Sequence, residues 1–251
     1  LLAALGAVRL PFACAVSWYG DALARHAAEI ARAPCPVLLQ IAGDDERTTA
    51  HARATFDASV ADNPAIRQAV HAGCRPGFAD PASLAYDKTT RGLAWSRMIA
   101  ELRRELGPHY DLSALWDAHT HHEFVTRDVD ATMATMVDAP YVNHVPTMTG
   151  GVGHAHLKRF YKHHFVDANP PDTRLIPVSR TVGVDRLVDE IVFCFTHTSE
   201  IPWMLPGVPP TGRYVEVPLV AIVAFRGDRL CHEHIYWDQA SVLVQIGLLD
   251  P

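Results

Sequence analysis

The chain has 251 residues, with 22 Lys and Arg, 28 Asp and Glu, and a hydrophobic fraction of 49%. This composition is typical of a globular protein and excludes disorder as the main state. No apolar run reaches the roughly 18 residues of a transmembrane helix, so we expect no membrane partner. The net charge of -6 argues against nucleic-acid binding.

The five cysteines are scattered and form no Cys-x-x-Cys pair, which predicts reduced thiols in a cytoplasmic protein. The length permits one large domain or two small ones. Most of the acidic excess lies after Gly107 and Pro108, and this shift predicts two domains, at residues 1–108 and 109–251.

The first part alternates strand and helix patterns. Short apolar runs predict strands at 12–19, 36–42 and 65–72, and helical patterns cover 48–60 and 84–106. Continuous apolar strands between helices indicate a parallel sheet that is covered on both faces. We therefore expect an α/β fold for this part.

The second part has its helical patterns first and its strands afterwards. Helices are predicted at 112–136 and 155–165, strands at 174–182, 190–198, 214–226 and 230–238, and a last helix at 239–249. This order is typical of an α+β fold with an antiparallel sheet.

Three motifs in the first part carry a family resemblance: AVSWYG at 15–20, PVLLQIAGDDE at 36–46 and HAGCRPGFAD at 71–80. In this order, residues 1–106 resemble the C-terminal half of the dienelactone hydrolase (carboxymethylenebutenolidase) family, which has the α/β-hydrolase fold. The resemblance implies ester or lactone hydrolysis by a Cys-His-Asp triad. It places Asp45 (or Asp44) at the position of the triad acid.

The other two triad positions depart from the family. Pro76 occupies the histidine position, and proline cannot accept a proton. The Gly-x-Cys-x-Gly turn of the nucleophile would precede Leu1, and none of the five cysteines has these flanking glycines. Since nucleophile and base must lie within hydrogen-bond reach, we expect this part to be catalytically incomplete. We expect a further hydrolase segment before Leu1, and a structural role for His71.

The second part carries another set of phrases: YVNH at 141–144, TGG at 149–151, FTHT at 195–198, GVPPTGR at 207–213 and EHIYWD at 233–238, closing with QIG at 245–247. In this order they resemble the SnoaL-like polyketide cyclase family, which has the nuclear-transport-factor-2-like fold. The resemblance implies a curved sheet and helices that form a cone with one deep pocket. It also implies a homodimer, and an aspartate near the end of the last strand as general acid/base.

The predicted last strand has two chemically different faces. Glu233 shares one face with Cys231, Ile235 and Trp237, whereas the other face carries His232, His234, Tyr236 and Asp238. Periodicity alone cannot say which face is buried. We expect the second face, with its four polar groups, to line the pocket. Asp238 would be the acid/base with a raised pKa; the alternative for Asp238 is the N-cap of the following helix.

Further candidate residues follow from the same phrases. We expect His197, His144 and Tyr236 to orient or polarise a carbonyl group. Substrate-binding candidates are Asn143, Trp203, Met204 and His234. No cofactor and no metal are expected, because His119, His121 and His122 do not converge on their helix and are expected to face solvent.

These patterns favour a SnoaL-like pocket protein with cofactor-free acid/base chemistry, of a cyclase or isomerase type, on a small apolar carbonyl compound. One alternative is an ester or lactone hydrolase whose nucleophile lies upstream of Leu1. A second alternative is a non-catalytic ligand-binding or dimerisation module, because a fold does not establish a function.

Overall fold

The structure is a computed structural model, and it describes residues 1–20 and 22–250. It divides into two compact units, Leu1–His109 and Tyr110–Pro251. Among the described residues, no helix combines the length and the apolar character that a bilayer span requires.

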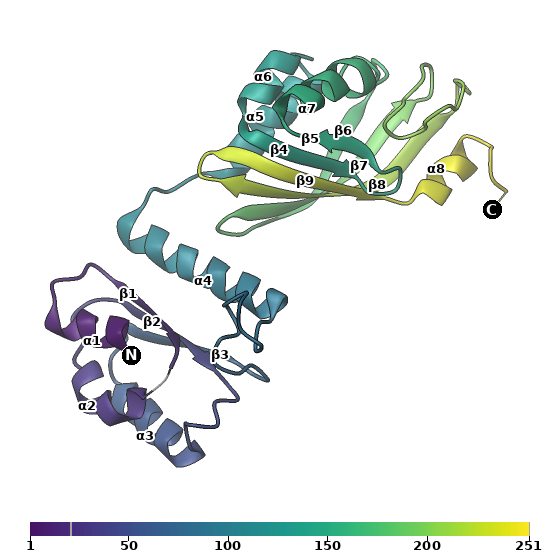
Figure 1. Cartoon of the computed structure of the whole chain (residues 1–251). Coiled ribbons are helices and arrows are strands. Elements are labelled where there is room, and N and C mark those ends of the chain that lie inside the picture. The colour runs from purple at the N-terminus through teal and green to yellow at the C-terminus, as the bar shows by residue number, and fades with distance from the viewer. Residues whose placement is uncertain (21, 251) are drawn as a thin grey trace. The chain divides into compact units, whose positions relative to one another are not determined.

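The first unit is built on a parallel sheet in the order β1-β2-β3. Its strands are β1 (Ala15–Tyr19), β2 (Val37–Ala42) and β3 (Ile66–His71), and its helices are α1 (Leu2–Arg9), α2 (Ala27–Ile30), α3 (Ala50–Val60) and α4 (Lys88–Leu106). Helices α1 to α3 lie on one face of the sheet and α4 on the other (Figure 1). The expected α/β fold with a parallel sheet is confirmed, whereas α1 was not expected.

Strand β2 shows why this sheet forms. It is the central strand, and all six of its residues are buried. Helices cover both faces, so a continuous apolar run is stable there. Gln40 is its polar member, and its side chain donates to the carbonyl of Ala94 and contacts His71 Nε2 at 2.8 Å.

The second unit contains a six-stranded sheet in the order β5-β4-β9-β8-β7-β6. Its strands are β4 (Met136–His144), β5 (Thr149–Val152), β6 (Arg174–Val182), β7 (Arg186–Thr196), β8 (Tyr214–Arg226) and β9 (Arg229–Trp237). Its helices are α5 (Leu112–Phe124), α6 (Val129–Ala134), α7 (His154–Phe160) and α8 (Gln239–Gln245).

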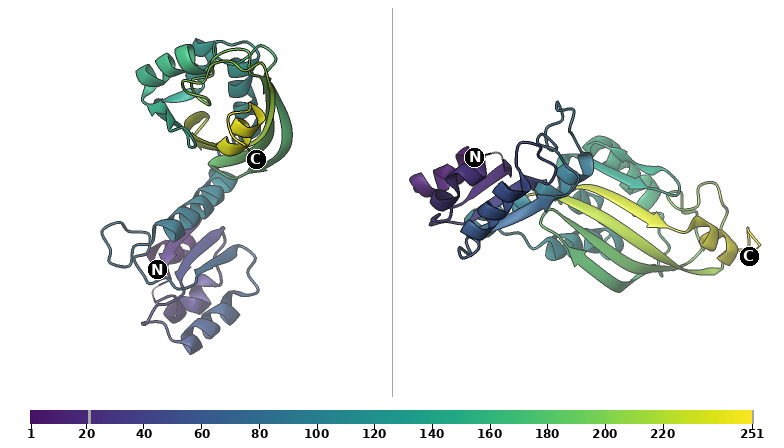
Figure 2. Two further views of the ribbon diagram at one scale, coloured as in Figure 1. Left: turned by 90° about the vertical axis from the view of Figure 1, so that its right-hand side faces the viewer. Right: turned by 90° about the horizontal axis from the view of Figure 1, so that it is seen from below.

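This sheet differs from the expectation because it has two further strands, β4 and β5, and because one of its pairings is parallel. Strand β4, which was not predicted, pairs with β9 in parallel, while β8 pairs with both β7 and β9 in antiparallel. The sheet is therefore mixed rather than antiparallel throughout. Figure 2 shows that it curves around the interior of the unit, with helices along its open side. This is the curved sheet with packed helices that we expected.

The core of the second unit lies inside this curve and is rich in aromatic side chains. Its buried rings belong to Trp116, Phe160, Tyr161, Phe165, Phe193, Phe195, Trp203, Phe225 and Trp237. Many of them contact each other edge to face, as aromatic pairs prefer. These rings pack the helices against the sheet, and some of them form the walls of the site described next.

Candidate functional site

A cavity of about 160 Å³ lies in the interior of the second unit. Residues of α5 and of the inner face of the sheet line it, and six of the lining residues are aromatic: Trp116, Phe124, Tyr161, Phe165, Phe193 and Trp203. Aliphatic residues of β6 to β9 complete the walls. An apolar enclosure with a few polar groups is typical of a small-molecule site.

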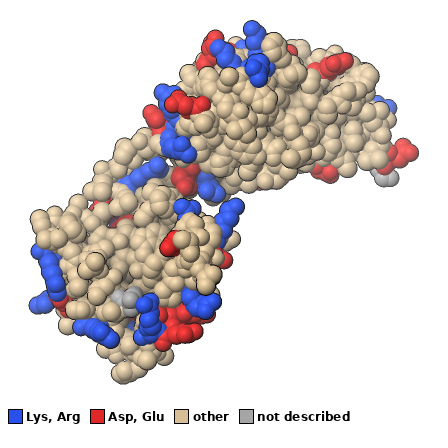
Figure 3. All heavy atoms as spheres, in the orientation of Figure 1, with Lys and Arg blue, Asp and Glu red and all other residues tan. Residues whose placement is uncertain are grey.

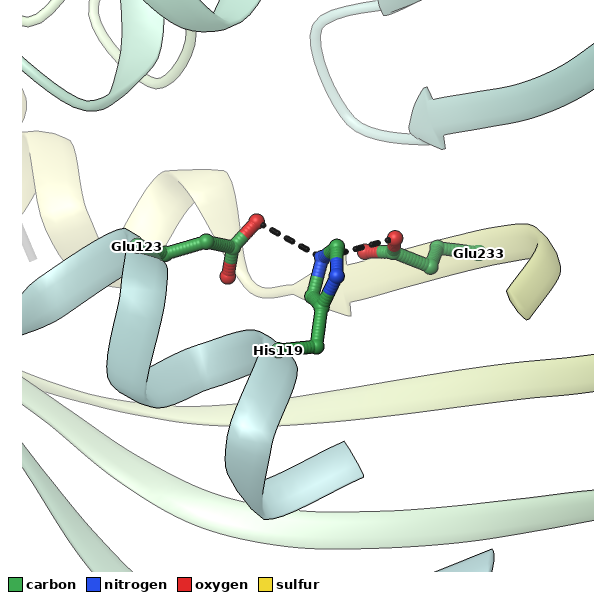
Figure 4. A group of neighbouring side chains, drawn as sticks. All are labelled: His119, Glu123 and Glu233. Carbon is green, nitrogen blue, oxygen red and sulfur yellow. Dashed lines mark hydrogen bonds and ion pairs between the residues drawn. The ribbon is translucent and has the colours of Figure 1, made fainter. Parts of the chain in front are cut away.

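Three ionisable side chains meet beside this cavity. Figure 4 shows His119 and Glu123 on helix α5 and Glu233 on strand β9, with the imidazole between the two carboxylates. His119 Nε2 lies 3.1 Å from Oε1 of Glu123 and 3.3 Å from Oε1 of Glu233. All three are buried, and the two glutamates line the cavity. Tyr161 adds a fourth polar group, because its hydroxyl donates to Glu233 at 3.3 Å.

The hydrogen bonds of Thr135 determine the protonation of His119. The Thr135 hydroxyl donates to the carbonyl of Thr132 at 2.7 Å, so its oxygen accepts from His119 Nδ1 at 2.6 Å. Nδ1 therefore carries a proton. Nε2 faces two carboxylate oxygens, and a bare nitrogen lone pair there would be repelled by both. A second proton on Nε2 makes the ring an imidazolium ion that binds both glutamates.

The pKa values agree with this arrangement. Burial by itself would lower the pKa of His119, but the charges and hydrogen bonds of Glu123 and Glu233 outweigh it and raise the pKa to about 10. Burial also raises the pKa of Glu123, although His119 opposes the shift. The pKa of Tyr161 is raised, first by burial and then by the two glutamates. The cluster therefore holds protons among buried side chains.

Local sequence explains how the cluster forms. Helix α5 begins at Asp111, whose carboxylate accepts from the backbone N–H of Ala114. Its buried residues are Leu112, Trp116, His119 and Glu123, which recur in steps of four, three and four and so share one face. The Trp116 ring stacks on the His119 imidazole with centroids 5.5 Å apart. On β9, residue alternation turns Glu233 inward between Val142 of β4 and Val223 of β8.

His144, at the end of β4, is a second imidazole in the cavity wall. It is buried among aromatic rings, with the Trp203 ring centroid 4.8 Å away and the Phe165 ring stacked at 5.3 Å. Burial lowers its pKa to about 4, although the charge of Glu233 opposes this. His144 is therefore neutral at neutral pH, and a neutral imidazole can donate one hydrogen bond and accept another.

An ion-pair network forms another part of the wall. Arg180 of β6 binds Asp189 of β7 through two hydrogen bonds of 3.0 and 2.9 Å, and it binds Asp117 of α5 at 2.8 Å. Trp116 Nε1 donates to Asp189 as well. Asp117 is largely exposed, so this network marks the outer part of the cavity, away from the buried cluster. It also ties α5 to the sheet.

The structure places Asp238 outside the cavity, and the expected raised pKa is wrong. Its carboxylate caps helix α8 by accepting from the backbone N–H of Ala240, and it accepts from the Ser241 hydroxyl at 2.6 Å. These hydrogen bonds lower its pKa. Tyr236 and His234 lie with it on the outer face of the sheet, where Tyr236 is 40% exposed and His234 contacts the ring of Tyr141. The alternation on β9 was predicted correctly, but the other face lines the cavity.

The remaining predicted residues divide between cavity and core. Trp203 and His144 line the cavity, whereas Met204 is buried and Asn143, next to His144 on β4, is half-buried, and neither lines it. His197 is buried just after β7, with Nδ1 3.2 Å from the Thr211 hydroxyl, and it does not line the cavity either. Burial lowers the pKa of His197.

His119, Glu123 and Glu233 were not predicted as site residues. His119 was expected to face solvent, but its side chain is fully buried. A usable signal existed, because Leu112 and Trp116 mark the apolar face of α5, and His119 and Glu123 continue it. Two polar residues on the buried face of a helix need partners.

The same cluster could also hold a divalent cation. Ligand atoms of His119, Glu123 and Glu233 all lie within 4.8 Å of one another, and nitrogen with two carboxylate oxygens is a suitable donor set. A proton on Nε2 of His119 satisfies both carboxylates without a metal.

In the first unit, Asp45 and Pro76, which the resemblance assigns to two positions of a hydrolase triad, lie after the ends of strands. Asp45 follows β2, and Pro76 follows β3; both line the same surface hollow. The Asp45 carboxylate accepts from the Arg47 backbone at 3.0 Å and from the Thr48 hydroxyl at 3.2 Å. His71 is buried, and its Nε2 is paired with Gln40. No imidazole lies among the residues that line this hollow, as far as the chain is described.

Comparison with solved structures finds likeness over the second half of the chain. A putative polyketide cyclase from Acidithiobacillus ferrooxidans shares 21% identity at a TM-score of 0.45, covering 53% of this chain and 92% of its own. A putative SnoaL-like polyketide cyclase from Jannaschia shares 18% at 0.42, covering 55% and 94%. A protein of ketosteroid isomerase-like fold from Catenulispora acidiphila, solved with trimethylamine, shares 17% at 0.42, covering 54% and 93%.

At these identities and TM-scores, the likenesses leave the activity of the chain open. No curated protein matches the chain. The first unit gives a family match, because residues 1–106 match the dienelactone hydrolase family. The chain thus joins a segment that matches this hydrolase family to a unit that is similar in structure to SnoaL-like polyketide cyclases.

Proposed function

We propose that the second unit is a cofactor-free acid/base enzyme that moves a proton on a small carbonyl compound, in a cyclase-like or isomerase-like reaction. One observation carries this proposal: two carboxylates that share an imidazolium ion line an apolar cavity. Proton transfer at a carbon next to a carbonyl group needs a base that is kept away from water, together with a hydrogen-bond donor for the oxygen.

The residues divide these roles between them. Glu233 is the base, because it lines the cavity and its charge acts on His144. It accepts the proton from the α-carbon of the ligand, and the carbonyl oxygen gains the negative charge of an enolate. The neutral His144 donates a hydrogen bond to that oxygen. Return of the proton from Glu233 to carbon completes the cycle.

His119 and Glu123 act as positioning residues. The imidazolium ion binds both carboxylates, so it orients Glu233 and offsets the cost of a buried negative charge. Glu123 binds the same imidazolium ion as Glu233, so its own charge can change when Glu233 gains or loses a proton. The charge that Glu233 loses when it accepts the proton is therefore shared within the cluster, and it is not confined to one isolated carboxylate.

Deuterium incorporation tests the proposal. The full chain is incubated with cyclohexanone in deuterated buffer, and NMR follows loss of the α-proton signal. We expect exchange above the buffer rate and a loss of about 10²- to 10⁴-fold in Glu233→Gln, the range that one general acid/base supplies. Addition of a chelator should leave the rate unchanged.

Asp238→Asn provides the matched control, because Asp238 lies on the same segment but outside the cavity. It should exchange like the unaltered chain. Equal rates for Glu233→Gln and the unaltered chain would contradict the proposed base, and loss of exchange in Asp238→Asn would restore the assignment that the resemblance implies. Ligand binding without any exchange would favour a non-catalytic binding module.

The hydrolase alternative concerns the first unit. Residues 1–106 match a hydrolase family and place Asp45 beside Pro76, so an ester or lactone hydrolase would need its nucleophile and base from residues other than these. We propose that Asp45 occupies the position of the triad acid in that family. An ester assay on the longest available reading frame, with Asp45→Asn as the variant, tests this alternative separately from the cavity.

Two further proposals concern the oligomeric state of the protein and its cellular compartment. We propose a homodimer through the outer face of the second sheet, where Tyr236 is exposed. Figure 3 shows few charged side chains over the middle of the second unit on the side in view. Sedimentation measurements with Tyr236→Glu test this interface. All five cysteines are free, which supports a reducing compartment such as the cytoplasm.

A further inference from the structure

We infer that the cavity takes a ligand with one uncharged six-membered ring that carries the carbonyl group, and that it rejects fused rings and carboxylates. This inference rests on the proposed function, because it names the substrate class of the same cavity. Size, the rigidity of the walls and charge each support the inference.

The size of the cavity sets the first limit. Its volume is about 160 Å³. An engineered apolar cavity of about 150 Å³ in another protein holds one benzene molecule. A single six-membered ring therefore fills this cavity, and a second fused ring has to remain outside or displace a wall.

The walls are rigid, so they cannot easily move for a larger ligand. Phe193, Tyr161 and Trp203 each line the cavity and are each 1% exposed. The Trp203 ring lies 5.5 Å from Phe193 and 5.1 Å from Phe165, and its Nε1 donates to Asn169. A wall ring that moved outward would lose these contacts and disturb a close-packed core.

The charges in the lining set the second limit. Among the described lining residues, the carboxylates are Asp117, Glu123, Asp189 and Glu233, and the only guanidinium belongs to Arg180. Arg180 already binds Asp189 through two of its nitrogens and Asp117 through the third. A ligand carboxylate would therefore meet negative charge without a free cation, which is unfavourable in an apolar enclosure.

The polar groups also set the direction in which the ring enters. His144, Glu233 and Tyr161 lie at the buried end, whereas Asp117 and Arg180 are partly exposed at the outer end. Apolar residues of β6 to β8, such as Leu175 and Leu219, lie in the wall as well. The carbonyl oxygen of the ring consequently points to the buried end, where His144 can donate to it.

Three ketones test size and charge with the full chain. They are cyclohexanone (one ring), 1-decalone (two fused rings) and 3-oxocyclohexane-1-carboxylate (one ring with a charge). Calorimetry measures the dissociation constant of each, and NMR in deuterated buffer measures exchange at the α-carbon. We expect binding of 1-decalone and of the carboxylate to be weaker than that of cyclohexanone by a factor of about ten or more, the effect of roughly 1.4 kcal/mol.

A pair of phenylalanines supplies the matched variants. Phe193 and Phe195 are both buried on β7, but Phe193 lines the cavity and Phe195 does not. Phe193→Ala should enlarge the cavity and bind 1-decalone about tenfold more tightly than the unaltered chain does, which brings its affinity to that of cyclohexanone. Phe195→Ala should keep the preference for one ring. If either alanine variant unfolds, Phe193→Leu and Phe195→Leu replace the pair.

The outcomes separate this inference from the proposed function. Equal or tighter binding of 1-decalone or of the carboxylate by the unaltered chain overturns the inference, even where exchange occurs and the proposed function stands. Selective binding of cyclohexanone without exchange supports the inference and contradicts the acid/base function. The inference would also be overturned if Phe195→Ala raised the affinity for 1-decalone tenfold, as Phe193→Ala is expected to do.

Discussion

The two faces of strand β9 differ in their side chains and in how far these side chains are buried. On the inner face, Glu233 is buried against His119 and lines the cavity. On the outer face, His232, His234 and Tyr236 contact one another, and Asp238 follows at the end as a helix cap. The outer face has more polar groups, yet its carboxylate has a lowered pKa and is bound to local donors.

Enclosure therefore matters more for acid/base chemistry than the number of polar groups on a face. A solvent-exposed carboxylate whose oxygens already accept local hydrogen bonds, as in Asp238, is held in its charged form and contributes little to proton transfer at carbon. Glu233, by contrast, is held in a fixed position beside His119 in the wall of an apolar cavity. We therefore expect substitutions on the inner face to affect activity and stability, and those on the outer face to affect neither strongly.

The largest expected effect on stability follows removal of the imidazole. His119→Ala leaves Glu123 and Glu233 buried without their shared partner. This change should lower the free energy of local unfolding of α5 and β9 by about 3–5 kcal/mol. Amide hydrogen exchange of the two segments measures it. His121→Ala, on the exposed side of the same helix, is the control and should stay within about 0.5 kcal/mol.

The stabilisation by His119 should disappear at alkaline pH. Its folded pKa of about 10 lies above the ordinary value of 6.5, so the bound proton stabilises the fold fully below 6.5. This stabilisation is lost as the pH rises through about 10. The stability gap between the unaltered chain and His119→Ala should therefore narrow between neutral and alkaline pH in urea titrations. A gap that stays constant over this range would mean that His119 is neutral.

Acid should weaken the fold through His144. Its folded pKa of about 4 lies below the ordinary value of 6.5, so the neutral ring stabilises the fold above 6.5 and this contribution is lost as the pH falls through 4. The loss amounts to about 3 kcal/mol for a shift of this size. His144→Gln should therefore lose less stability on acidification than the unaltered chain does. Identical acid unfolding of the two chains would show that His144 is not held neutral.

The smallest effects are expected on the outer face. Tyr236→Phe removes a hydroxyl from a ring that is 40% exposed, so thermal melting and deuterium exchange should both stay close to those of the unaltered chain. Asp238→Ala removes the cap of α8, so it should lower the melting temperature slightly and leave exchange unchanged. A large loss of exchange in either variant would show that the outer face takes part in the chemistry.

Much of the architecture could be predicted from the sequence. The parallel sheet of the first unit and the strands β6, β8 and β9 follow from apolar runs and alternation. Strand β4 was missed because its Asp138 and Ala139 interrupt the apolar pattern, and both are exposed in the strand. Its parallel pairing with β9 joins segments far apart in the chain, which local pattern does not reveal.

The site itself was predicted only in part. His144 and Trp203 were identified through the resemblance and do line the cavity. The choice between the two faces of β9 failed because a period of two is the same for either face, and only the fold decides which one is buried. The inner partner of Glu233 comes from α5, over a hundred residues earlier, so the cluster exists only after folding.

The protonation of His119 offers the most direct test of the buried acid/base cluster. Nitrogen-15 NMR of the imidazole rings in the full chain, at about pH 8, distinguishes an imidazolium ion from a neutral ring, and His119→Gln identifies the signal. We predict that both nitrogens of His119 carry protons at this pH, while His144 has one bare nitrogen. A bare nitrogen on His119 would contradict the shared proton, and with it the proposed site.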